Sequence, residues 1–165
     1  MAYTLITTAG GPLTYTNDGA VRRALPGCDC VLEANYTAPT LSGTTFSSSD
    51  VLLKICGRLV SGSDTITIDT SGTYWGVVLQ ITNETVSLGE LTATTISGLK
   101  QQLTQGDIND NTTNTYQALI AYGLSNSGSP TIDWYLPDYA HCGTLYGTTD
   151  PTAGNYADGT VYIKI

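Results

Sequence analysis

The sequence predicts an all-β domain, an antiparallel β-sandwich or barrel of jelly-roll type, with one short helix at most and an irregular N-terminal arm. Three observations predict it. The 165 residues include 28 Thr, 12 Ser and 11 Tyr but only 3 Glu and 3 Lys, so helix formers are depleted and strand formers enriched. Apolar side chains recur at every second position in one stretch of the chain. Similar short stretches are separated by Gly, Asn, Asp, Ser and Pro, which are turn residues.

The clearest strand signal runs over residues 73–82. Every second side chain there is large and apolar, which predicts one buried face made of Trp75, Val77, Leu79 and Ile81. Thr65–Asp69 also alternates, and a Thr-Ser-Gly turn follows it, so we predict a hairpin from Asp64 to Thr82. Further strands are predicted over the following ranges: Val51–Cys56, Thr85–Thr94, Thr115–Tyr122, Thr131–Leu136 and Thr160–Ile165.

One helix is expected, over Ile96–Gln105. Leu99 and Leu103 have i, i+4 spacing, Thr95 is a suitable N-cap, and Gly106 is a suitable end. No repeat of fixed period is present, which disfavours a solenoid or a propeller.

The character of the chain changes near residue 45. Residues 1–45 contain the turn sequences Gly10-Gly11-Pro12 and Asn17-Asp18-Gly19, which keep regular elements short. We therefore predict an irregular arm over 1–45 and a β domain, including the C-terminal strand, over 46–165. Arg22 and Arg23 carry two of the six positive charges of the chain, so the arm is a candidate attachment segment.

Charge and hydropathy exclude two classes of partner. The formal net charge of −8 and the pI of about 4.2 are opposite to the basic surface of a nucleic-acid-binding domain. No apolar run is long enough to span a membrane. Met1–Gly11 lacks the basic and apolar regions of a signal peptide, so we expect synthesis in the cytoplasm.

One stretch resembles a calcium loop in part. Asp107, Asn109 and Asn111 occupy positions 1, 3 and 5, but Thr112 stands where an EF-hand needs Gly, and Ala118 where it needs Glu. An EF-hand is therefore excluded. Two interpretations of the loop remain open, turn formation by these Asx residues and a looser cation site.

Soft metal ligands are also present, namely Cys28, Cys30, Cys56, His141 and Cys142. Structural zinc sites generally use two Cys-x2-4-Cys knuckles, whereas this chain has a single Cys-x-Cys. We therefore expect no bound metal or other cofactor. The pairing of the cysteines, if they pair, does not follow from their spacing.

Candidates for catalysis are few. A nucleophilic hydrolase would need His141, the only histidine, and no Gly-x-Ser-x-Gly elbow is present. A glycosidase would need two carboxyl groups facing one another, for which Asp133, Asp138 and Glu90 are candidates. Because any acidic chain offers such pairs, we expect a protein that is not an enzyme and keep a small hydrolase as an alternative.

Aromatic residues gather in the last third of the chain. Four of them are candidate contacts to a partner or a glycan: Trp134, Tyr135, Tyr139 and Tyr146. Exposed aromatic rings stack on sugars or anchor protein interfaces, but the same residues also occur in cores and along strands. Both readings remain open.

Three segments together show a resemblance. Residues 66–81 and 115–121 are similar to β-rich domains of accessory virion proteins of tailed bacteriophages, in which a Gly-Thr-Tyr … Leu-x-Ile strand precedes a Tyr-x-x-Leu-Ala strand. Residues 147–163 resemble the Gly-Thr-x-x-Pro … Asp-Gly-x-x-Tyr-Ile segment of phage head fibres, tail fibres and baseplate proteins. The residues before Thr45 carry no such resemblance.

The resemblance implies a structural protein of the virion, either a capsid decoration or head fibre or a tail or baseplate component. It implies a homotrimer with contacts to capsid or tail proteins and no catalytic residues, and it leaves a host-surface glycan open as a further partner. A charge-poor surface of neutral hydroxyls agrees with tight symmetric packing, because burying charge is costly. The alternative is a carbohydrate-binding β-sandwich that uses Trp134, Tyr135 and Tyr139.

Overall fold

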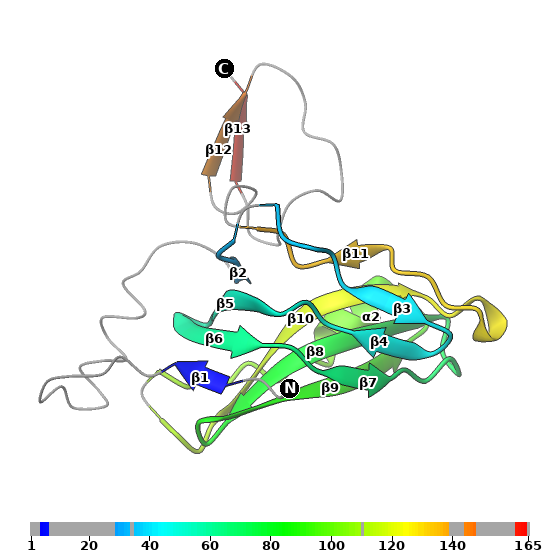
Figure 1. Ribbon diagram of the computed structural model, residues 1–165, viewed down its shortest axis with the longest axis horizontal. Coiled ribbons are helices and arrows are strands. Elements are labelled where there is room, and N and C mark those ends of the chain that lie inside the picture. Colours follow the sequence, from blue (N-terminus) through cyan, green and yellow to red (C-terminus); the bar gives the residue numbers. More distant parts are fainter. Residues whose placement is uncertain are drawn as a thin grey trace, which may run out of the picture.

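Most of the described part of the chain forms two facing β layers, with helix α2 on the outside and a separate two-stranded sheet, β12-β13, beside them (Figure 1). In the computed structural model, residues 4–6, 29–33, 35–109, 111–138, 144–147 and 161–164 are described, and side chains within 29–33, 35–109 and 111–138. The predicted all-β sandwich is confirmed. The strands are β1 Thr4–Ile6, β2 Cys30–Val31, β3 Thr40–Ser42, β4 Thr45–Ser47, β5 Val51–Ile55, β6 Arg58–Gly62, β7 Thr65–Thr67, β8 Tyr74–Thr82, β9 Thr85–Ala93, β10 Thr115–Leu124, β11 Trp134–Tyr135, β12 Thr144–Gly147 and β13 Val161–Lys164.

The first layer is an antiparallel sheet with the strand order β11-β10-β8-β9. Its long strands β8 and β9 form a hairpin through Asn83 and Glu84, both with positive φ as a type I′ turn requires. On the other side β8 pairs with β10 along its whole length, and a bulge between Leu119 and Ala121 shifts the register.

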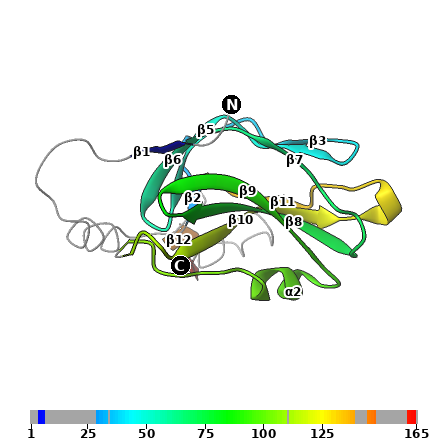
Figure 2. The same ribbon diagram turned by 90° about the horizontal axis from the view of Figure 1, so that it is seen from below.

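The second layer consists of two sheets with the orders β1-β6-β5-β2 and β3-β4-β7. The two sheets are connected twice, because β4 leads directly into β5 and β6 into β7. At the bend between them the Ser48 N–H donates to the Asp64 carbonyl (3.0 Å), and the Asp64 N–H donates to Ser48 Oγ (2.8 Å). The two layers face one another in Figure 2.

The core lies between the layers. The face of β8 predicted to be buried is buried throughout, with Trp75 and Val77 fully enclosed. Trp75 packs against Phe46 of the opposite layer, with ring centroids 6.0 Å apart. Such pairs of large apolar side chains supply most of the stabilisation of a sandwich.

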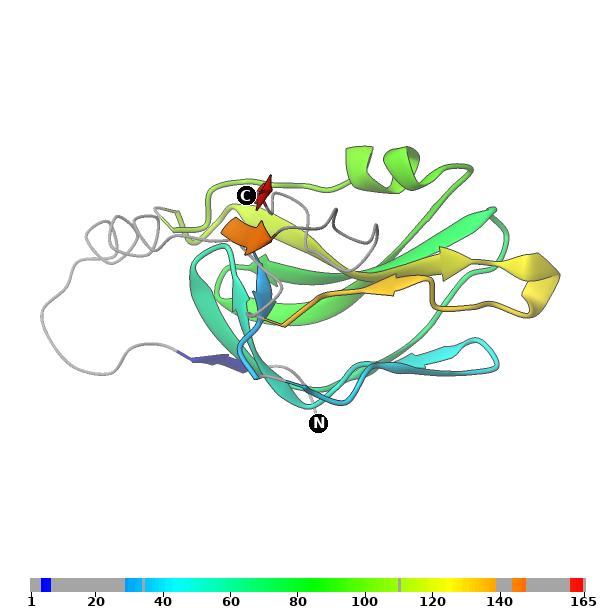
Figure 3. The same ribbon diagram turned by 90° about the horizontal axis from the view of Figure 1, so that it is seen from above.

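Helix α2, Ile96–Gln101, covers the other face of the first layer (Figure 3). Its Leu99 is fully buried, and a Cβ added at Gly76 of β8 would lie 3.4 Å from Leu99 Cδ1 and 3.0 Å from Leu119 Cδ1. The glycine therefore lets the helix approach the sheet closely. The Thr95 cap is confirmed, since its Oγ1 accepts the Gly98 N–H at 3.0 Å.

Two predictions of local structure are corrected. The hairpin from Asp64 to Thr82 is wrong, because β7 pairs with β4 in the second layer and β8 with β9 and β10 in the first. The helix ends at Gln101 and not at Gln105, because the Gln117 N–H donates to the Thr104 carbonyl at 2.7 Å and draws that segment alongside β10.

Two further predictions concern the C-terminal strand and the domain boundary at residue 45. The predicted C-terminal strand forms β13, which pairs with β12 in a parallel, not antiparallel, arrangement. The predicted domain boundary at residue 45 falls after β2 and β3, which pair with β5 and β4, so the sheets begin upstream of it. Arg22 and Arg23 lie outside the described residues.

Within the described ranges, no helix has the length and apolar character needed to cross a membrane.

Candidate functional site

A surface groove of about 550 Å³ lies where the chain before β3 passes the bend between β4 and β5. This volume is in the usual range for small-molecule sites. We call it the groove; its lining residues are Glu33, Asn35, Tyr36, Thr37, Ala38, Thr40, Ser47, Ser48, Ser49, Asp50 and Val51. Hydroxyl groups dominate this lining, so the groove presents neutral donors and acceptors to a ligand.

Tyr36 is fixed at the groove by contacts to the segment that contains β11. Its hydroxyl donates to the Leu136 carbonyl. Its ring meets that of Tyr135 edge to face, with centroids 6.1 Å apart and planes at 88°. Tyr135 is 41% exposed, and no other large apolar residue whose side chain is described reaches this exposure. The pair therefore offers aromatic surface next to the groove.

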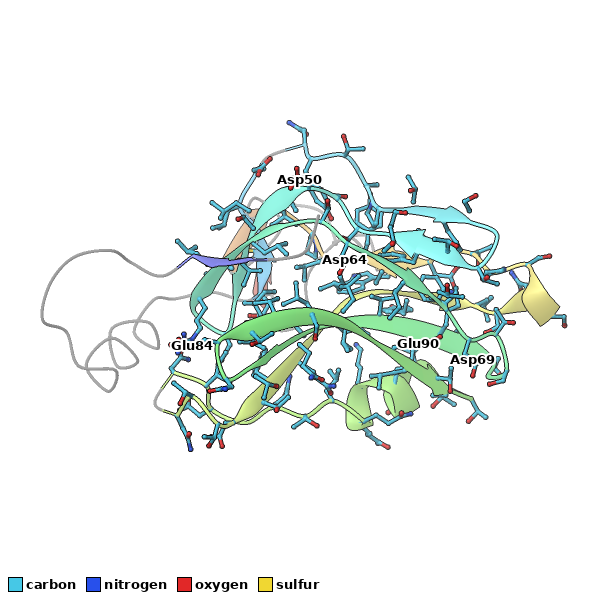
Figure 4. The ribbon with its side chains drawn as sticks, turned by 60° about the horizontal axis from the view of Figure 1, so that its bottom comes forward. Asp50, Asp64, Asp69, Glu84 and Glu90 are labelled. Carbon is cyan, nitrogen blue, oxygen red and sulfur yellow. The ribbon has the colours of Figure 1, made fainter. Side chains whose placement is uncertain are left out.

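Polar contacts hold the two walls of the groove together. Ser49 Oγ donates to the Thr37 carbonyl across it. Glu33 Oε1 accepts the Leu52 N–H at 2.8 Å, which holds that carboxylate at the rim. Asp50 is exposed and lies at the start of β5 (Figure 4).

A small apolar cavity of about 30 Å³ lies beneath the groove. Groove and cavity share the lining residues Tyr36, Ser48, Ser49 and Val51. The remaining lining of the cavity is Val31, Pro39, Phe46, Leu53, Ile120 and Leu136. The cavity has the size of one or two water molecules, yet most of its wall is apolar, so it suits a small apolar group better than water.

Of the four candidate aromatic residues, Trp134 and Tyr135 do not share one surface. Trp134 and Tyr135 are consecutive in β11 and therefore point to opposite faces of the sheet. Trp134 stacks on Tyr122, with centroids 5.3 Å apart and planes at 16°, whereas Tyr135 meets Tyr36. Tyr139 lies outside the described residues, and the backbone of Tyr146 is described but not its side chain.

A second polar site is partly buried: Asn109 is buried, and Asp29, Cys56 and Tyr116 are half-buried. We call these four residues the buried polar cluster. Asp29 Oδ1 accepts the Cys56 N–H at 2.7 Å and Asp29 Oδ2 the Tyr116 hydroxyl at 3.0 Å. Asn109 Nδ2 donates to Cys56 Sγ at 3.4 Å. These bonds join β10 and the loop before it to the turn between β5 and β6, and Figure 1 shows these elements close together.

Burial dominates the acid–base properties of this cluster. It raises the pKa of the Asp29 carboxyl, although the bonds from Cys56 and Tyr116 and the charge of Lys54 act in the opposite direction. Burial and the Asp29 charge raise the pKa of Tyr116 far above its usual value. Burial likewise raises the pKa of the Cys56 thiol, so Cys56 is a poor nucleophile.

The candidate metal ligands are not brought together where the structure describes them. Within that part of the chain no group of three His, Cys, Asp or Glu side chains could hold a metal, and Cys30 and Cys56 are free thiols. Cys28, His141 and Cys142 lie outside the described residues.

The side chains of the Asx loop are used in turns. Asp107 Oδ1 accepts the Asn109 N–H and Asn111 Oδ1 the Thr113 N–H, each at 2.9 Å. The amide of Asn109 points to Cys56 in the interior, not back into its own loop. This agrees with the turn interpretation of the loop.

Among the candidate glycosidase carboxylates, Glu90 is separated from Asp133 and Asp138. Glu90 lies in β9, at one edge of the first layer, and Asp133 and Asp138 flank β11 at the other edge. Three strand spacings, about 14 Å, divide these edges, more than either glycosidase geometry uses. Glu90 instead accepts the Asp69 N–H, and the two residues lie side by side in Figure 4. Asp138 is buried and accepts the Asn35 N–H at 3.3 Å.

Comparison with known proteins adds no relative to this picture. No protein-family model matches the chain, and searches of the curated proteins and of the solved structures find no significant match.

Proposed function

We propose that the chain is a non-enzymatic structural protein on the surface of a tailed-phage particle, a capsid decoration or head fibre or a tail or baseplate component. The resemblance of residues 66–81 and 115–121 supports this proposal, and both segments belong to the sandwich. Among the residues whose side chains are described, Ser and Thr are the commonest exposed residues, and Lys100 is the one exposed Lys or Arg. Such a surface suits close contact between neutral faces.

The observation that carries an assembly role is the edge of β9. The nine residues of β9 pair with β8 on one side, and no other described strand pairs with its second side. Because the hairpin turn has two residues, Val86, Leu88, Glu90 and Thr92 direct their backbone N–H and C=O groups to that side. A long unpaired edge is a template for strand pairing, so we propose it as the contact that forms a homotrimer.

Replacement of Leu88 tests this contact. Leu88→Pro removes the outward N–H, whereas the control Leu88→Ala shortens the same side chain and keeps that N–H. We expect a trimer of the 17.4 kDa chain for the wild type and for Leu88→Ala, and monomers for Leu88→Pro, by sedimentation equilibrium. A monomeric wild type would contradict the proposed trimer. Failure of the folded wild type to associate with purified capsids or tails would contradict the particle role.

A second candidate function is the binding of a neutral glycan, and the groove beside Tyr36 and Tyr135 favours it. The site differs from the one expected from the sequence, because Trp134 faces away from Tyr135. We therefore expect Tyr135→Ala to weaken glycan binding and Trp134→Ala to leave it unchanged, as measured on a glycan array.

A further inference from the structure

The groove and the cavity beneath it together define the shape of a ligand. A molecule that fills both needs a polar body for the groove and one small apolar branch for the cavity. Tyr36, Ser48, Ser49 and Val51 line both spaces, so the branch would pass between these four side chains.

The cavity limits the size and polarity of the branch. Its volume of about 30 Å³, close to that of one or two water molecules, suits a methyl group. Phe46 and Leu53 in its wall are nearly inaccessible to solvent, and these apolar side chains cannot satisfy a polar group. A buried methyl group is therefore the best occupant.

Ser49 provides a polar contact at the entrance to the cavity. Its hydroxyl donates its proton to the Thr37 carbonyl, so its oxygen keeps lone pairs that can accept a hydrogen bond from a ligand. A donor attached close to the methyl group would meet this oxygen. An acetamido group, with its N–H two bonds from the methyl carbon, has this arrangement.

The charge of the groove selects among ligands that carry an acetamido group. Its lining contains the carboxylates of Glu33 and Asp50 and, among the described residues that form it, no Lys or Arg. Carboxylates accept hydrogen bonds from sugar hydroxyls and repel anionic sugars and phosphates. The half-exposed Tyr135, which contacts Tyr36 of the groove, adds aromatic surface on which a pyranose could stack.

We propose that the groove binds a neutral N-acetylated amino sugar, with the acetyl methyl group in the apolar cavity, the acetamido N–H on Ser49 Oγ and the ring hydroxyls at Glu33 and Asp50. This inference deepens the glycan-binding function and rests on it. It does not depend on the particle role or on the trimer.

The test compares two sugars that differ only in the acetamido group at each ring. Tri-N-acetylchitotriose and cellotriose are titrated into the full chain, and affinities are measured by calorimetry or by NMR shifts. Burial of one methyl group predicts at least about fourfold tighter binding of the acetylated sugar.

Two variants and one control locate the effect. Val51→Ile adds a methyl group at a residue that lines the cavity, and we expect it to abolish the preference for the acetylated sugar. Val86→Ile makes the same change at a valine of similar burial in β9 and should keep the preference. Ser49→Ala leaves the core side chains unchanged and should weaken the acetylated sugar more than cellotriose, so the test holds even if Val51→Ile does not fold.

The outcomes separate the two levels of the proposal. Equal affinity of the wild type for both sugars would overturn the acetyl inference and leave glycan binding standing. Binding of neither sugar would overturn both. A preference that survives in both Val51→Ile and Ser49→Ala would place the acetyl group elsewhere and overturn the assignment of the cavity.

Discussion

The buried polar cluster and the groove are both rich in polar side chains, but their hydrogen bonds are directed differently. In the cluster Asp29 accepts hydrogen bonds from Cys56 and Tyr116, so the polar atoms of these half-buried residues bond one another. In the groove the side chains of Ser49 and Glu33 bond the backbone and remain at the surface. The comparison shows that polarity alone does not mark a binding site. A site also needs polar groups that a ligand can reach and space to hold it.

We therefore expect substitutions in the two regions to have different effects on stability and on ligand binding. Replacements in the cluster should change stability without changing ligand binding, because its polar groups bond one another and none of them lines the groove. Replacements in the groove should change binding with little loss of stability. The hydrophobic core that both regions share should be the most sensitive to substitution.

Trp75→Ala should have the largest effect and destabilise both regions together. Trp75 is fully buried and contacts Phe46, which also lines the cavity. Truncation of a buried Trp costs about 3–5 kcal/mol of unfolding free energy. Denaturant unfolding followed by fluorescence of Trp134 measures it. A loss of less than about 1 kcal/mol would show that the two layers do not share this core.

Asp29→Ala should break the buried polar cluster and leave the groove intact. The change leaves the Cys56 N–H and the Tyr116 hydroxyl without their acceptor, which costs about 1–3 kcal/mol for each group that stays buried. Asp133→Ala, at an exposed carboxylate, is the matched control and should cost little. Unchanged unfolding of Asp29→Ala would mean that the cluster does not stabilise the fold.

The pH dependence of stability should distinguish the charge of Asp29 from its shape. Burial raises the pKa of Asp29 above 3.8, so the folded chain binds this proton more tightly than the unfolded chain. The stabilisation from this proton is complete below pH 3.8 and is lost as the pH rises through the raised pKa. Asp29→Asn keeps the shape and cannot ionise. The wild type should therefore gain stability relative to Asp29→Asn as the pH falls from 7 to 4, as measured by urea unfolding. A gain in the opposite direction would mean that the hydrogen bonds to the carboxylate outweigh burial.

Tyr36→Phe should have the smallest effect on stability, within the groove alone. It removes one hydroxyl bond to the Leu136 carbonyl, worth about 0.5–1.5 kcal/mol, and keeps the ring beside Tyr135. Glycan binding should weaken because the ring loses its anchor. If Tyr36→Phe lowers stability by more than Asp29→Ala does, the division between a structural cluster and a binding groove is wrong.

The sequence predicted those parts of the fold that depend on local pattern. Alternation identified the buried face around Trp75, and Thr95 identified the start of α2. The hairpin from Asp64 to Thr82 was not predictable in this way, because the partners of β7 and β8 lie elsewhere in the chain. Pairing over long sequence distances leaves no mark in a short window.

The candidate site was predicted only in part. Tyr135 was singled out, and its separation from Trp134 follows from the alternation of a strand that the sequence already predicted. Tyr36 and Ser49 were missed, because their segments meet only in the folded chain and neither carries a motif. The run Ser47-Ser48-Ser49-Asp50 next to a predicted strand was the one signal available.

Hydrogen–deuterium exchange with and without tri-N-acetylchitotriose tests the contrast between the two regions most directly. The groove should gain protection in residues 33–40 and 47–52, whereas residues 54–58 and 107–116 around the buried polar cluster should exchange as in the free chain. Protection confined to the cluster, or spread evenly over both regions, would contradict the assignment of binding to the groove.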